Sequence, residues 1–514
     1  MRSSGILMPV FSLPGKYGIG CFSKKAYEFI DFLSEAGQSL WQILPLGPTS
    51  YGDSPYQSFS TFAGNPYFID LEELIKIGLL QESEINETGL NKKTGKIDYA
   101  FLYNTRFDLL RKAYERANIE NNPEFQNFVN NESEWLEDYA LYMAVKASFN
   151  NRSLEFWDKD IRIREPKALK KYSDKYRDDV LFFEFIQFEF DREWKKLKAY
   201  ANSKGVSIIG DIPIYVSGDS ADVWANPKLF QLDQELRPIR VAGCPPDAFA
   251  VKGQLWGNPL YDWEYHKETD YDWWKKRMEK CADLYDVIRI DHFRGFDQFY
   301  SIPGDAEDAV NGKWINGPGT KLFRALQPEL DKKGTRIIAE DLGFITDTVR
   351  KLVKETGYPN MKVIEFAFDP DDDARTNDFL PFNYDKNCVA YTGTHDNETV
   401  MAWLKRIDKR TYQYIRKYVG GLFESKRDVA RSIIKEVIAS PAKYAIIPIQ
   451  DYLLLGEEGR INIPSTLGGN WQWRLDENML TPKLARKIRN LTSMYGRNYV
   501  SKEKASNKAK KHSL

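Results

Sequence analysis

The sequence Val287-Ile288-Arg289-Ile290-Asp291-His292 places an arginine and a carboxylate inside a short hydrophobic run. Side chains on a β-strand alternate between its two faces, so we expect Arg289 and Asp291 to share one face. A positive charge beside a carboxylate favours the ionised carboxylate at neutral pH. The run therefore predicts a buried strand that carries a negatively charged, functional Asp291 at its end.

Seven other runs resemble this one in length and composition. Several are rich in Val and Ile, each is bounded by Gly, Pro or polar residues, and none alternates strictly between polar and hydrophobic residues. These features are typical of strands that are buried on both faces of a parallel sheet. The eight expected strands lie at about residues 5–10, 39–46, 207–216, 287–296, 335–341, 361–368, 388–396 and 444–452.

Segments with helical spacing lie between these runs. Ala26, Phe29, Ile30 and Leu33 form one hydrophobic stripe, and a last helix is expected at Pro482, because proline suits the first turn of a helix. Strand and helix therefore alternate along the chain. This alternation predicts an α/β protein built on a (β/α)8 TIM barrel, with large subdomain insertions over the C-terminal face.

The connections between the runs divide the chain into segments. Two connections are too long for a simple strand-helix-strand unit, so we expect them to carry structure of their own. The expected segments are the start of the barrel in 1–70, a mainly helical insertion in 71–205, the third strand in 206–216, a loop-dominated insertion rich in Trp, Pro and Gly near the active site in 217–286, the rest of the barrel in 287–500, and a disordered basic tail in 501–514.

The charge and the cysteines restrict the kind of partner and the compartment. Lys and Arg number 73 and Asp and Glu 74, so no net field attracts nucleic acid or an acidic membrane, and we expect a neutral small molecule as partner. The four cysteines show no CxxC spacing. The chain has no hydrophobic signal segment at its start and no run long enough to span a bilayer, so we expect a cytoplasmic protein.

The residues that end the hydrophobic runs are mostly acids. Barrel enzymes place their catalytic groups at the C-terminal ends of the strands, where Asp211, Asp291, Glu340 and Asp396 are expected to converge. Burial and neighbouring carboxylates raise the pKa of a carboxyl group, which suits Glu340 to hold a proton while Asp291 stays ionised. Two carboxyl groups in different protonation states are what retaining glycosyl transfer requires. A single acid at a strand end is more often a structural cap, and Asp341 is the best candidate for that role.

Histidines and loop aromatics extend this candidate site. His292 and His395 adjoin the acids and could donate hydrogen bonds to sugar hydroxyls. Neither has a second His or Cys at ligand spacing, so we expect no metal. Tyr56 and Trp256 lie in Gly- and Pro-rich loops, where their faces could stack on sugar rings, whereas Trp224, Trp263, Trp273 and Trp274 are expected to pack in the interior. No phosphate-binding glycine loop indicates a nucleotide, so we expect no cofactor.

Several longer motifs resemble one family. The chain is similar over about residues 5–473 to glycoside hydrolase family 77, the 4-α-glucanotransferases called amylomaltase or disproportionating enzyme. The motifs that carry the resemblance are Asp53-Ser54-Pro55-Tyr56-Gln57, Gly210-Asp211-Ile212-Pro213, Gly253-Gln254-Leu255-Trp256-Gly257-Asn258-Pro259, Arg289-Ile290-Asp291-His292-Phe293-Arg294-Gly295, Ala339-Glu340-Asp341-Leu342-Gly343 and Thr392-Gly393-Thr394-His395-Asp396-Asn397.

The resemblance implies a reaction and a set of roles. Asp291 is expected to attack the anomeric carbon, Glu340 to act as acid and then base, and Asp396 to stabilise the transition state. The donors are expected to be maltooligosaccharides or glucans derived from starch or glycogen, with glucose or another glucan as acceptor. The expected substrate-binding residues are Ser54, Tyr56, Asp211, Gln254, Trp256, Arg289, His292, His395, Asn462 and Pro464. The sequence Pro464-Ser465-Thr466 departs from the Pro-Gly-Thr of the family, which bears on product size.

Two other functions remain open at this point. A hydrolase on the same barrel would share every catalytic residue and would differ in the loops that cover the site. A noncatalytic glucan-binding barrel would bind without turnover, but it has no need of Arg289 beside Asp291 or of a Glu340 with a raised pKa.

Overall fold

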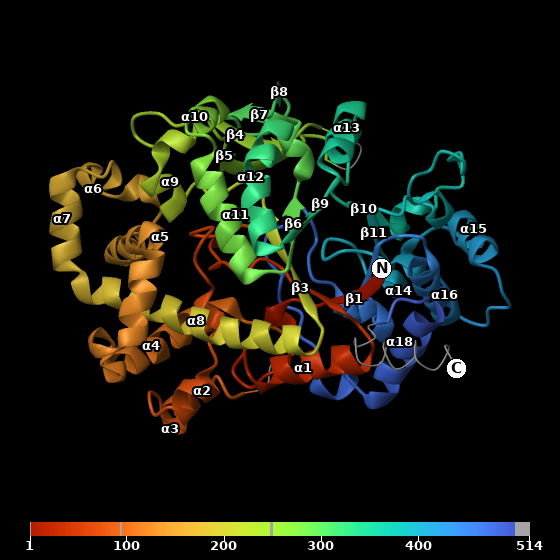
Figure 1. The fold of residues 1–514 in the computed structure, drawn as a ribbon, viewed down its shortest axis with the longest axis horizontal. Coiled ribbons are helices and arrows are strands. Elements are labelled where there is room, and N and C mark those ends of the chain that lie inside the picture. The colour runs from red at the N-terminus through yellow and green to blue at the C-terminus, as the bar shows by residue number, and fades with distance from the viewer. Residues whose placement is uncertain (1, 93–94, 247–249, 499–514) are drawn as a thin grey trace.

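The computed structural model of the chain describes residues 2–92, 95–246 and 250–498. Within these residues, the eight predicted runs form eight parallel strands that close into a barrel, which confirms the predicted fold class (Figure 1). The barrel strands are β1 (Ser3–Leu7), β2 (Leu40–Gln42), β3 (Ser207–Pro213), β6 (Val287–Asp291), β9 (Arg336–Ala339), β10 (Asn360–Val363), β11 (Cys388–Tyr391) and β12 (Tyr444–Pro448). The tail predicted at 501–514 lies outside the described residues.

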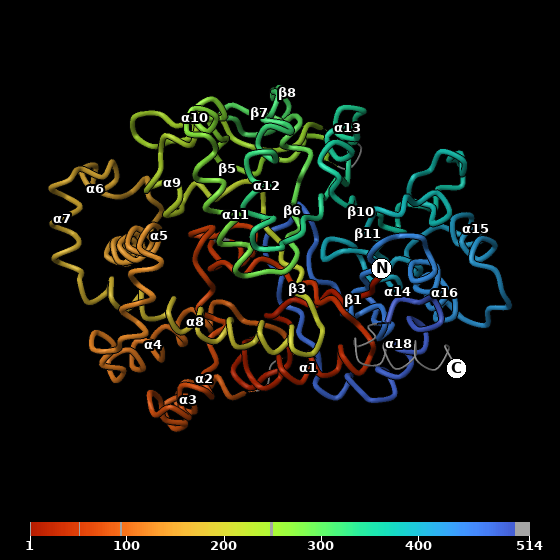
Figure 2. Tube along the Cα trace, viewed as in Figure 1, coloured from red at the N-terminus to blue at the C-terminus, as the bar shows by residue number. Residues whose placement is uncertain are grey.

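The barrel closes where its first strand meets its last. β1 pairs with β12 from Ser3 opposite Tyr444 to Leu7 opposite Pro448. Figure 2 shows the red start of the chain beside the blue C-terminal part at this seam. Strand residues such as Ile288, Ile338 and Ile446 are fully buried. Each fully buried side chain of this size contributes about 1.5–3 kcal/mol, so the barrel interior is a main source of stability.

Helices cover most of the barrel. The hydrophobic stripe of α1 (Lys24–Glu35) is buried as predicted, and the Thr481 side chain caps α18 (Pro482–Met494) by accepting the Leu484 N–H. The other helices of the barrel layer are α11 (Asp272–Leu284), α12 (Thr320–Lys333), α13 (Asp347–Thr356), α14 (Val400–Arg406), α15 (Lys409–Val419), α16 (Lys426–Ala439) and α17 (Ile449–Leu453).

The predicted alternation of strand and helix is wrong in one place. Residues 364–387, all of which the structure describes, connect β10 to β11 without an α-helix. The sequence Asp369-Pro370-Asp371-Asp372-Asp373 opens this connection. Asp369 and Asp373 accept hydrogen bonds from the backbone N–H groups two residues later. Such local bonds compete with helix formation, and proline disfavours a helical residue before it.

The first long insertion is mainly helical. It forms the orange and yellow lobe on the left of Figure 1, in which the long helices α5 and α8 pack against each other. α8 then leads back into β3. The helices are α2 (Leu71–Lys76), α3 (Glu82–Thr88), α4 (Tyr99–Ala117), α5 (Pro123–Ser148), α6 (Lys159–Arg162), α7 (Pro166–Lys175) and α8 (Arg177–Ser203).

The second insertion differs from the loop-dominated region that the sequence predicts. It holds the short helices α9 (Ala221–Ala225) and α10 (Trp263–Glu268) and the strands β4 (Arg240–Cys244) and β5 (Gln254–Pro259). These strands join β7 (Gln298–Pro303) and β8 (Lys313–Asn316) in an antiparallel sheet of order β5-β4-β7-β8, within the described residues. β7 and β8 come from the stretch that the sequence assigned to the rest of the barrel. The pairing of β4 with β7 joins segments about 60 residues apart, which local patterns do not reveal.

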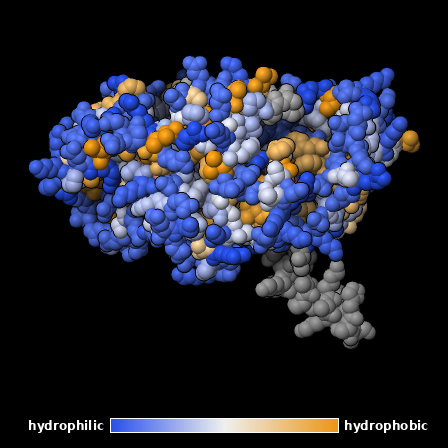
Figure 3. Space-filling view, turned by 90° about the horizontal axis from the view of Figure 1, so that it is seen from above, coloured by the Kyte–Doolittle hydropathy of each residue, from blue (hydrophilic) through white to orange (hydrophobic). Residues whose placement is uncertain are grey.

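The surface is mostly hydrophilic on the face drawn in Figure 3, where hydrophobic side chains gather in small separate groups. In the described part of the chain, no helix has the length and hydrophobicity needed to cross a bilayer.

Candidate active site

A buried chain of ion pairs connects the ends of β3 and β6. The Arg289 guanidinium donates to both carboxylate oxygens of Asp211 at 2.7 Å and pairs with Asp291 Oδ1 at 2.9 Å. The Tyr56 hydroxyl donates to Asp211 Oδ2 at 2.8 Å. Arg289 is only 3% exposed, so its charge acts on Asp291 with little screening by water. The prediction that Arg289 and Asp291 share a face is therefore confirmed.

Glu340 lies directly after β9 in a cradle of backbone groups. Its two carboxylate oxygens accept the N–H groups of His292 at 2.6 Å and of Leu342 at 2.7 Å. Burial and the charge of Asp291 raise the pKa of Glu340 to about 7, although Arg289 and these N–H groups act against the shift. Glu340 therefore holds a proton at a higher pH than an ordinary carboxyl group, as the sequence predicted.

His292 has a left-handed backbone, with a φ of 52°, which aims its N–H at Glu340. Non-glycine residues adopt this conformation rarely, and such strain is often found at functional sites. The Trp256 ring meets the His292 ring edge-on at 4.8 Å, and the Trp256 indole N–H donates to Gln254 Oε1 at 3.1 Å. Burial lowers the pKa of His292 to about 4, so its ring is neutral at physiological pH. The structure thus brings Gln254, Trp256 and His292 together.

A second cluster follows β11. His395 Nε2 lies 3.3 Å from Asp396 Oδ2, and the Asn462 amide donates to Asp396 Oδ1 at 2.6 Å. Burial alone would raise the pKa of Asp396, but the charge and hydrogen bond of His395, together with Asn462, lower it to about 2. Burial likewise opposes a charge on His395, and Asp396 outweighs it and raises the pKa of His395. Asp396 is therefore ionised at neutral pH.

Aromatic rings connect the two clusters. Tyr56 stacks on His395 with ring centroids 5.2 Å apart, and Trp471 lies 5.9 Å from Tyr56 and 6.0 Å from His395. Sequence reasoning did not single out Trp471. A signal was present, because Trp471 follows Gly468-Gly469-Asn470, a context like the one that singled out Trp256.

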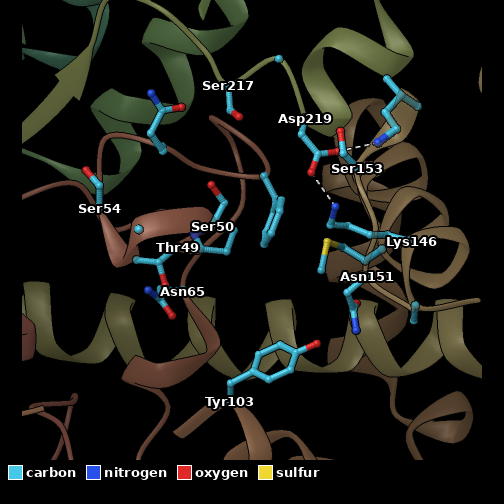
Figure 4. Close-up of a pocket in the computed structure, with 18 of the residues that line it drawn as sticks. Thr49, Ser50, Ser54, Asn65, Tyr103, Lys146, Asn151, Ser153, Ser217 and Asp219 are labelled. Carbon is cyan, nitrogen blue, oxygen red and sulfur yellow. Dashed lines mark hydrogen bonds and ion pairs between the residues drawn. The ribbon is translucent and has the colours of Figure 1, made fainter. Parts of the chain in front are cut away.

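A cavity of about 1270 Å3 adjoins these clusters and extends toward the helical insertion. Ser54, Trp256, Asn462 and Trp471 line its end nearest the clusters, whereas the three proposed catalytic acids are not among its lining residues. Figure 4 shows the cavity from Ser54 at one side to the ion pair of Lys146 with Asp219 at the other, whose atoms lie 2.6 Å apart, with hydroxyl and amide side chains between them. Such a lining of hydroxyls, amides and aromatic rings suits a neutral polar ligand.

Two predicted substrate-binding residues, Ser54 and Pro464, lie at the edge of the site and not among its ion pairs and rings. Ser54 Oγ accepts the Tyr56 N–H at 3.2 Å, so it shapes the turn that presents Tyr56 as well as lining the cavity. Pro464 is exposed between Ile463 and Ser465, which line the cavity.

The residues that sequence reasoning assigned to structural roles have such roles. Asp341 accepts the Met361 N–H at 3.0 Å and the Asn360 amide at 3.1 Å, which ties β9 to β10. Three of the four tryptophans expected in the interior, Trp224, Trp273 and Trp274, are buried, and Trp263 packs partly buried against the same core. Among the described residues, no group of three or more His, Cys, Asp or Glu side chains is arranged to hold a metal ion.

Comparisons with known proteins agree over almost the whole chain. The profile of glycoside hydrolase family 77, described as 4-alpha-glucanotransferase, matches residues 8–480. The chain is similar to the 4-alpha-glucanotransferase of Clostridium butyricum, with 48% identity over 496 residues that cover 95% of this chain and 100% of that protein. It is 46% identical to that of Streptococcus pneumoniae over 499 residues, which cover 96% and 97%. The amylomaltase of Streptococcus agalactiae, solved in complex with acarbose, is similar with a TM-score of 0.92 at 40% identity, covering 97% of this chain and 100% of that one.

Proposed function

We propose that this chain, which belongs to the 4-α-glucanotransferase family, transfers α-1,4-glucan segments between sugars by a double displacement in which Asp291 is the nucleophile. The observation that carries this proposal is the contrast between two neighbouring carboxyl groups. Asp291 is paired with a buried guanidinium at 2.9 Å, whereas burial raises the pKa of Glu340 to about 7. This division into a nucleophile and a proton donor is what retention at an anomeric carbon needs.

In the first half of the reaction, Asp291 attacks the anomeric carbon of the donor and Glu340 protonates the oxygen of the leaving sugar. The bond between the carbon and that oxygen breaks as the bond to Asp291 Oδ forms, so the product is a glycosyl ester and a shortened glucan. Asp396 is negative because His395 and Asn462 lower its pKa to about 2. A fixed negative charge stabilises the oxocarbenium-like transition state.

In the second half, a hydroxyl group of the acceptor displaces Asp291 and gives its proton to Glu340. The anomeric configuration is retained because it is inverted twice. Glu340 is suited to both steps, since a pKa of about 7 lets it release and take up a proton near neutral pH. Water in place of the acceptor would make the same steps a hydrolysis.

The substrates follow from the lining of the site. We propose maltooligosaccharides and glucans from starch or glycogen as donors, and glucose or another glucan as acceptor. The hydroxyls and amides of the cavity, with Tyr56, Trp256 and Trp471 beside them, match the hydroxyl groups and apolar faces of sugar rings. We assign two segments as covers of the site. One is the strand β5, which carries Trp256 and which the sequence predicted to be a loop, and the other is the loop that carries Asn462.

The test is a time course of products from purified protein and maltotriose. We expect a ladder of longer maltooligosaccharides together with free glucose. Only glucose and maltose at all times would overturn transfer in favour of hydrolysis. The variant Asp291→Asn should lose turnover and keep measurable binding of maltotriose, whereas Asp305→Asn makes the same change at an exposed position and should leave the ladder intact.

We also propose that the enzyme works in the cytoplasm. Cys21, Cys281 and Cys388 are buried, and burial raises the pKa values of their thiols to about 12, 11 and 12. Cysteines that are free and not paired in disulfides are typical of proteins in a reducing compartment. Fractionation of cells that produce the chain should place the activity with cytoplasmic markers, and recovery with the secreted proteins would contradict this.

A further inference from the structure

Phe344 is a large hydrophobic side chain that is exposed on the segment directly after the proposed acid. It is 72% exposed and follows Glu340 by four residues. Leu342, two residues before it, donates its N–H to the Glu340 carboxylate at 2.7 Å. Gly343 between them has a φ of 88°, which turns the chain outward immediately before Phe344. An isolated exposed hydrophobic residue needs no explanation, but one placed on the turn that holds a catalytic group suggests contact with the substrate.

The position of Phe344 is held by Arg294. The Arg294 guanidinium donates from Nη1 to the Phe344 carbonyl at 2.5 Å, and its central carbon lies 5.9 Å from the Phe344 ring centroid. Arg294 is buried and lies over the Trp314 ring at 4.0 Å. Trp314 in turn meets Tyr300 edge-on at 5.2 Å. Phe344 is therefore exposed at its side chain and anchored at its backbone.

The segment after β6, which carries Arg294, and the segment after β9, which carries Phe344, are also joined at Glu340. The Phe293 N–H donates to the Glu340 carbonyl at 3.0 Å, and the His292 N–H donates to its carboxylate at 2.6 Å. Three contacts thus connect the segment after β6 with the segment after β9, from Glu340 to Phe344. Residues on loops that are fixed in this way present their side chains with little loss of conformational entropy on binding.

The chemistry of the reaction decides which sugar lies here. Glu340 protonates the oxygen that leaves and later deprotonates the oxygen that attacks, so both the leaving sugar and the acceptor lie on its side of Asp291. The segment that continues from Glu340 therefore borders the acceptor side. An aromatic ring offers a flat apolar face, which is the surface that a glucose ring presents through its C–H groups.

We propose that Phe344 is the stacking platform for a glucose ring of the acceptor and so determines how well an acceptor competes with water. Arg294 and Trp314 act as positioning residues for this platform. The inference rests on the proposed function, because only a transferase has an acceptor to hold.

The test separates donor cleavage from acceptor use. With α-maltotriosyl fluoride, fluoride release in water alone reports attack by Asp291, and added maltose reports capture by an acceptor. For Phe344→Ala we expect unchanged fluoride release without maltose. The maltose concentration for half-maximal transfer should rise roughly 3- to 10-fold, the range for loss of one aromatic contact, and the share of donor lost to water should increase. Phe344→Trp should restore acceptor use, because it restores the flat ring.

The matched control is Phe156→Ala in the helical insertion. Phe156 is 51% exposed and lies under the Arg152 guanidinium at 4.1 Å, so it repeats the exposed ring and the arginine far along the chain from Glu340. We expect wild-type acceptor use from this variant. If the wild-type protein makes the maltotriose ladder and Phe344→Ala uses maltose as well as wild type does, the proposed role of Phe344 is wrong and the proposed function stands. A wild-type protein without transfer to maltose would instead overturn the proposed function.

Discussion

Two buried arginines lie at opposite ends of the barrel and have different partners. Arg289 lies at the C-terminal end and pairs with the carboxylates of Asp211 and Asp291. Arg497 lies at the N-terminal end, where it donates to four backbone carbonyls, those of Ser3, Ile438, Ser440 and Ala442. Arg497 thus ties the segments that enter β1 and β12 at the seam of the barrel.

The hydrogen-bond and ion-pair partners of the two arginines decide whether the pKa of each guanidinium rises or falls. Burial opposes the charge of both guanidiniums. Around Arg289 the negative charges of Asp211 and Asp291 outweigh burial and raise its pKa well above the usual range, whereas around Arg497 burial prevails and lowers its pKa to about 10. The C-terminal end therefore concentrates charge for chemistry, and the N-terminal end uses one charge to satisfy backbone groups. This contrast agrees with the general division of barrel enzymes into a catalytic and a stabilising end.

The largest effect is expected at the catalytic end. Arg289→Met removes the counter-charge that the buried Asp211 shares with the partly exposed Asp291, so repulsion between the two carboxylates disfavours the ionised nucleophile. We expect kcat for maltotriose to fall by about 10²- to 10³-fold, the scale of losing one preorganised electrostatic contact. A steady-state assay measures this. A kcat within tenfold of wild type would show that the charge of Arg289 is not needed for the chemistry.

The next effect concerns the other end and separates stability from catalysis. Arg497→Met removes the donors for four backbone carbonyls, three of them in buried hydrogen bonds, and we expect a loss of about 3 kcal/mol in the free energy of unfolding. Denaturant unfolding followed by tryptophan fluorescence measures the loss. At a temperature where the variant is folded, its kcat should equal that of wild type. A large fall in kcat per folded molecule would break the distinction between the two ends.

The pH dependence sharpens the comparison within the catalytic end. Glu340 must be protonated to donate, and burial with the charge of Asp291 raises its pKa to about 7. The glycosylation rate with maltotriose should therefore fall about tenfold per pH unit above that value, because the fraction of protonated Glu340 falls by the same factor. α-Maltotriosyl fluoride needs no proton for its leaving group, so its cleavage should lose this alkaline limb. If the rate fell at alkaline pH with both maltotriose and α-maltotriosyl fluoride, the fall would belong to a group other than Glu340.

The smallest effect is expected in a covering loop. Ser465 has a φ of 62°, in the left-handed region where glycine is unstrained. Ser465→Gly should raise the free energy of unfolding by up to about 1 kcal/mol, because relief of strain exceeds the entropy that glycine adds to the unfolded chain. Gly468→Ala, at a φ of 78° with open space around the added methyl group, should have the opposite sign. Thermal unfolding of both variants checks this, and equal signs would refute strain as the cause.

The barrel strands were predictable because each is marked by a pattern within a few consecutive residues. A strand buried on both faces is a short continuous hydrophobic run, and an acid that ends it lies at the catalytic face whatever its neighbours are. The pair Arg289 and Asp291 follows from the two-residue period of a strand, and the raised pKa of Glu340 follows from burial beside another acid.

The rest depends on contacts between distant segments. The sheet that pairs β4 with β7 and the contact between the Trp471 and Tyr56 rings join parts of the chain with no common local pattern. The left-handed backbone of His292 was not predictable either, because histidine adopts this conformation more often than most residues but still rarely. The connection between β10 and β11 could have been foreseen, since Pro370 and its neighbouring aspartates disfavour a helix.

The identity of the nucleophile can be tested directly by trapping the glycosyl enzyme. In Glu340→Gln, α-maltotriosyl fluoride can still react with Asp291, because fluoride leaves without a proton, but no base remains to activate the acceptor or water. Peptide mass analysis after brief incubation and acid quench should find one maltotriosyl group on the peptide that carries Asp291. No adduct, or an adduct on the peptide that carries Asp396, would contradict the assignment of Asp291 as the nucleophile.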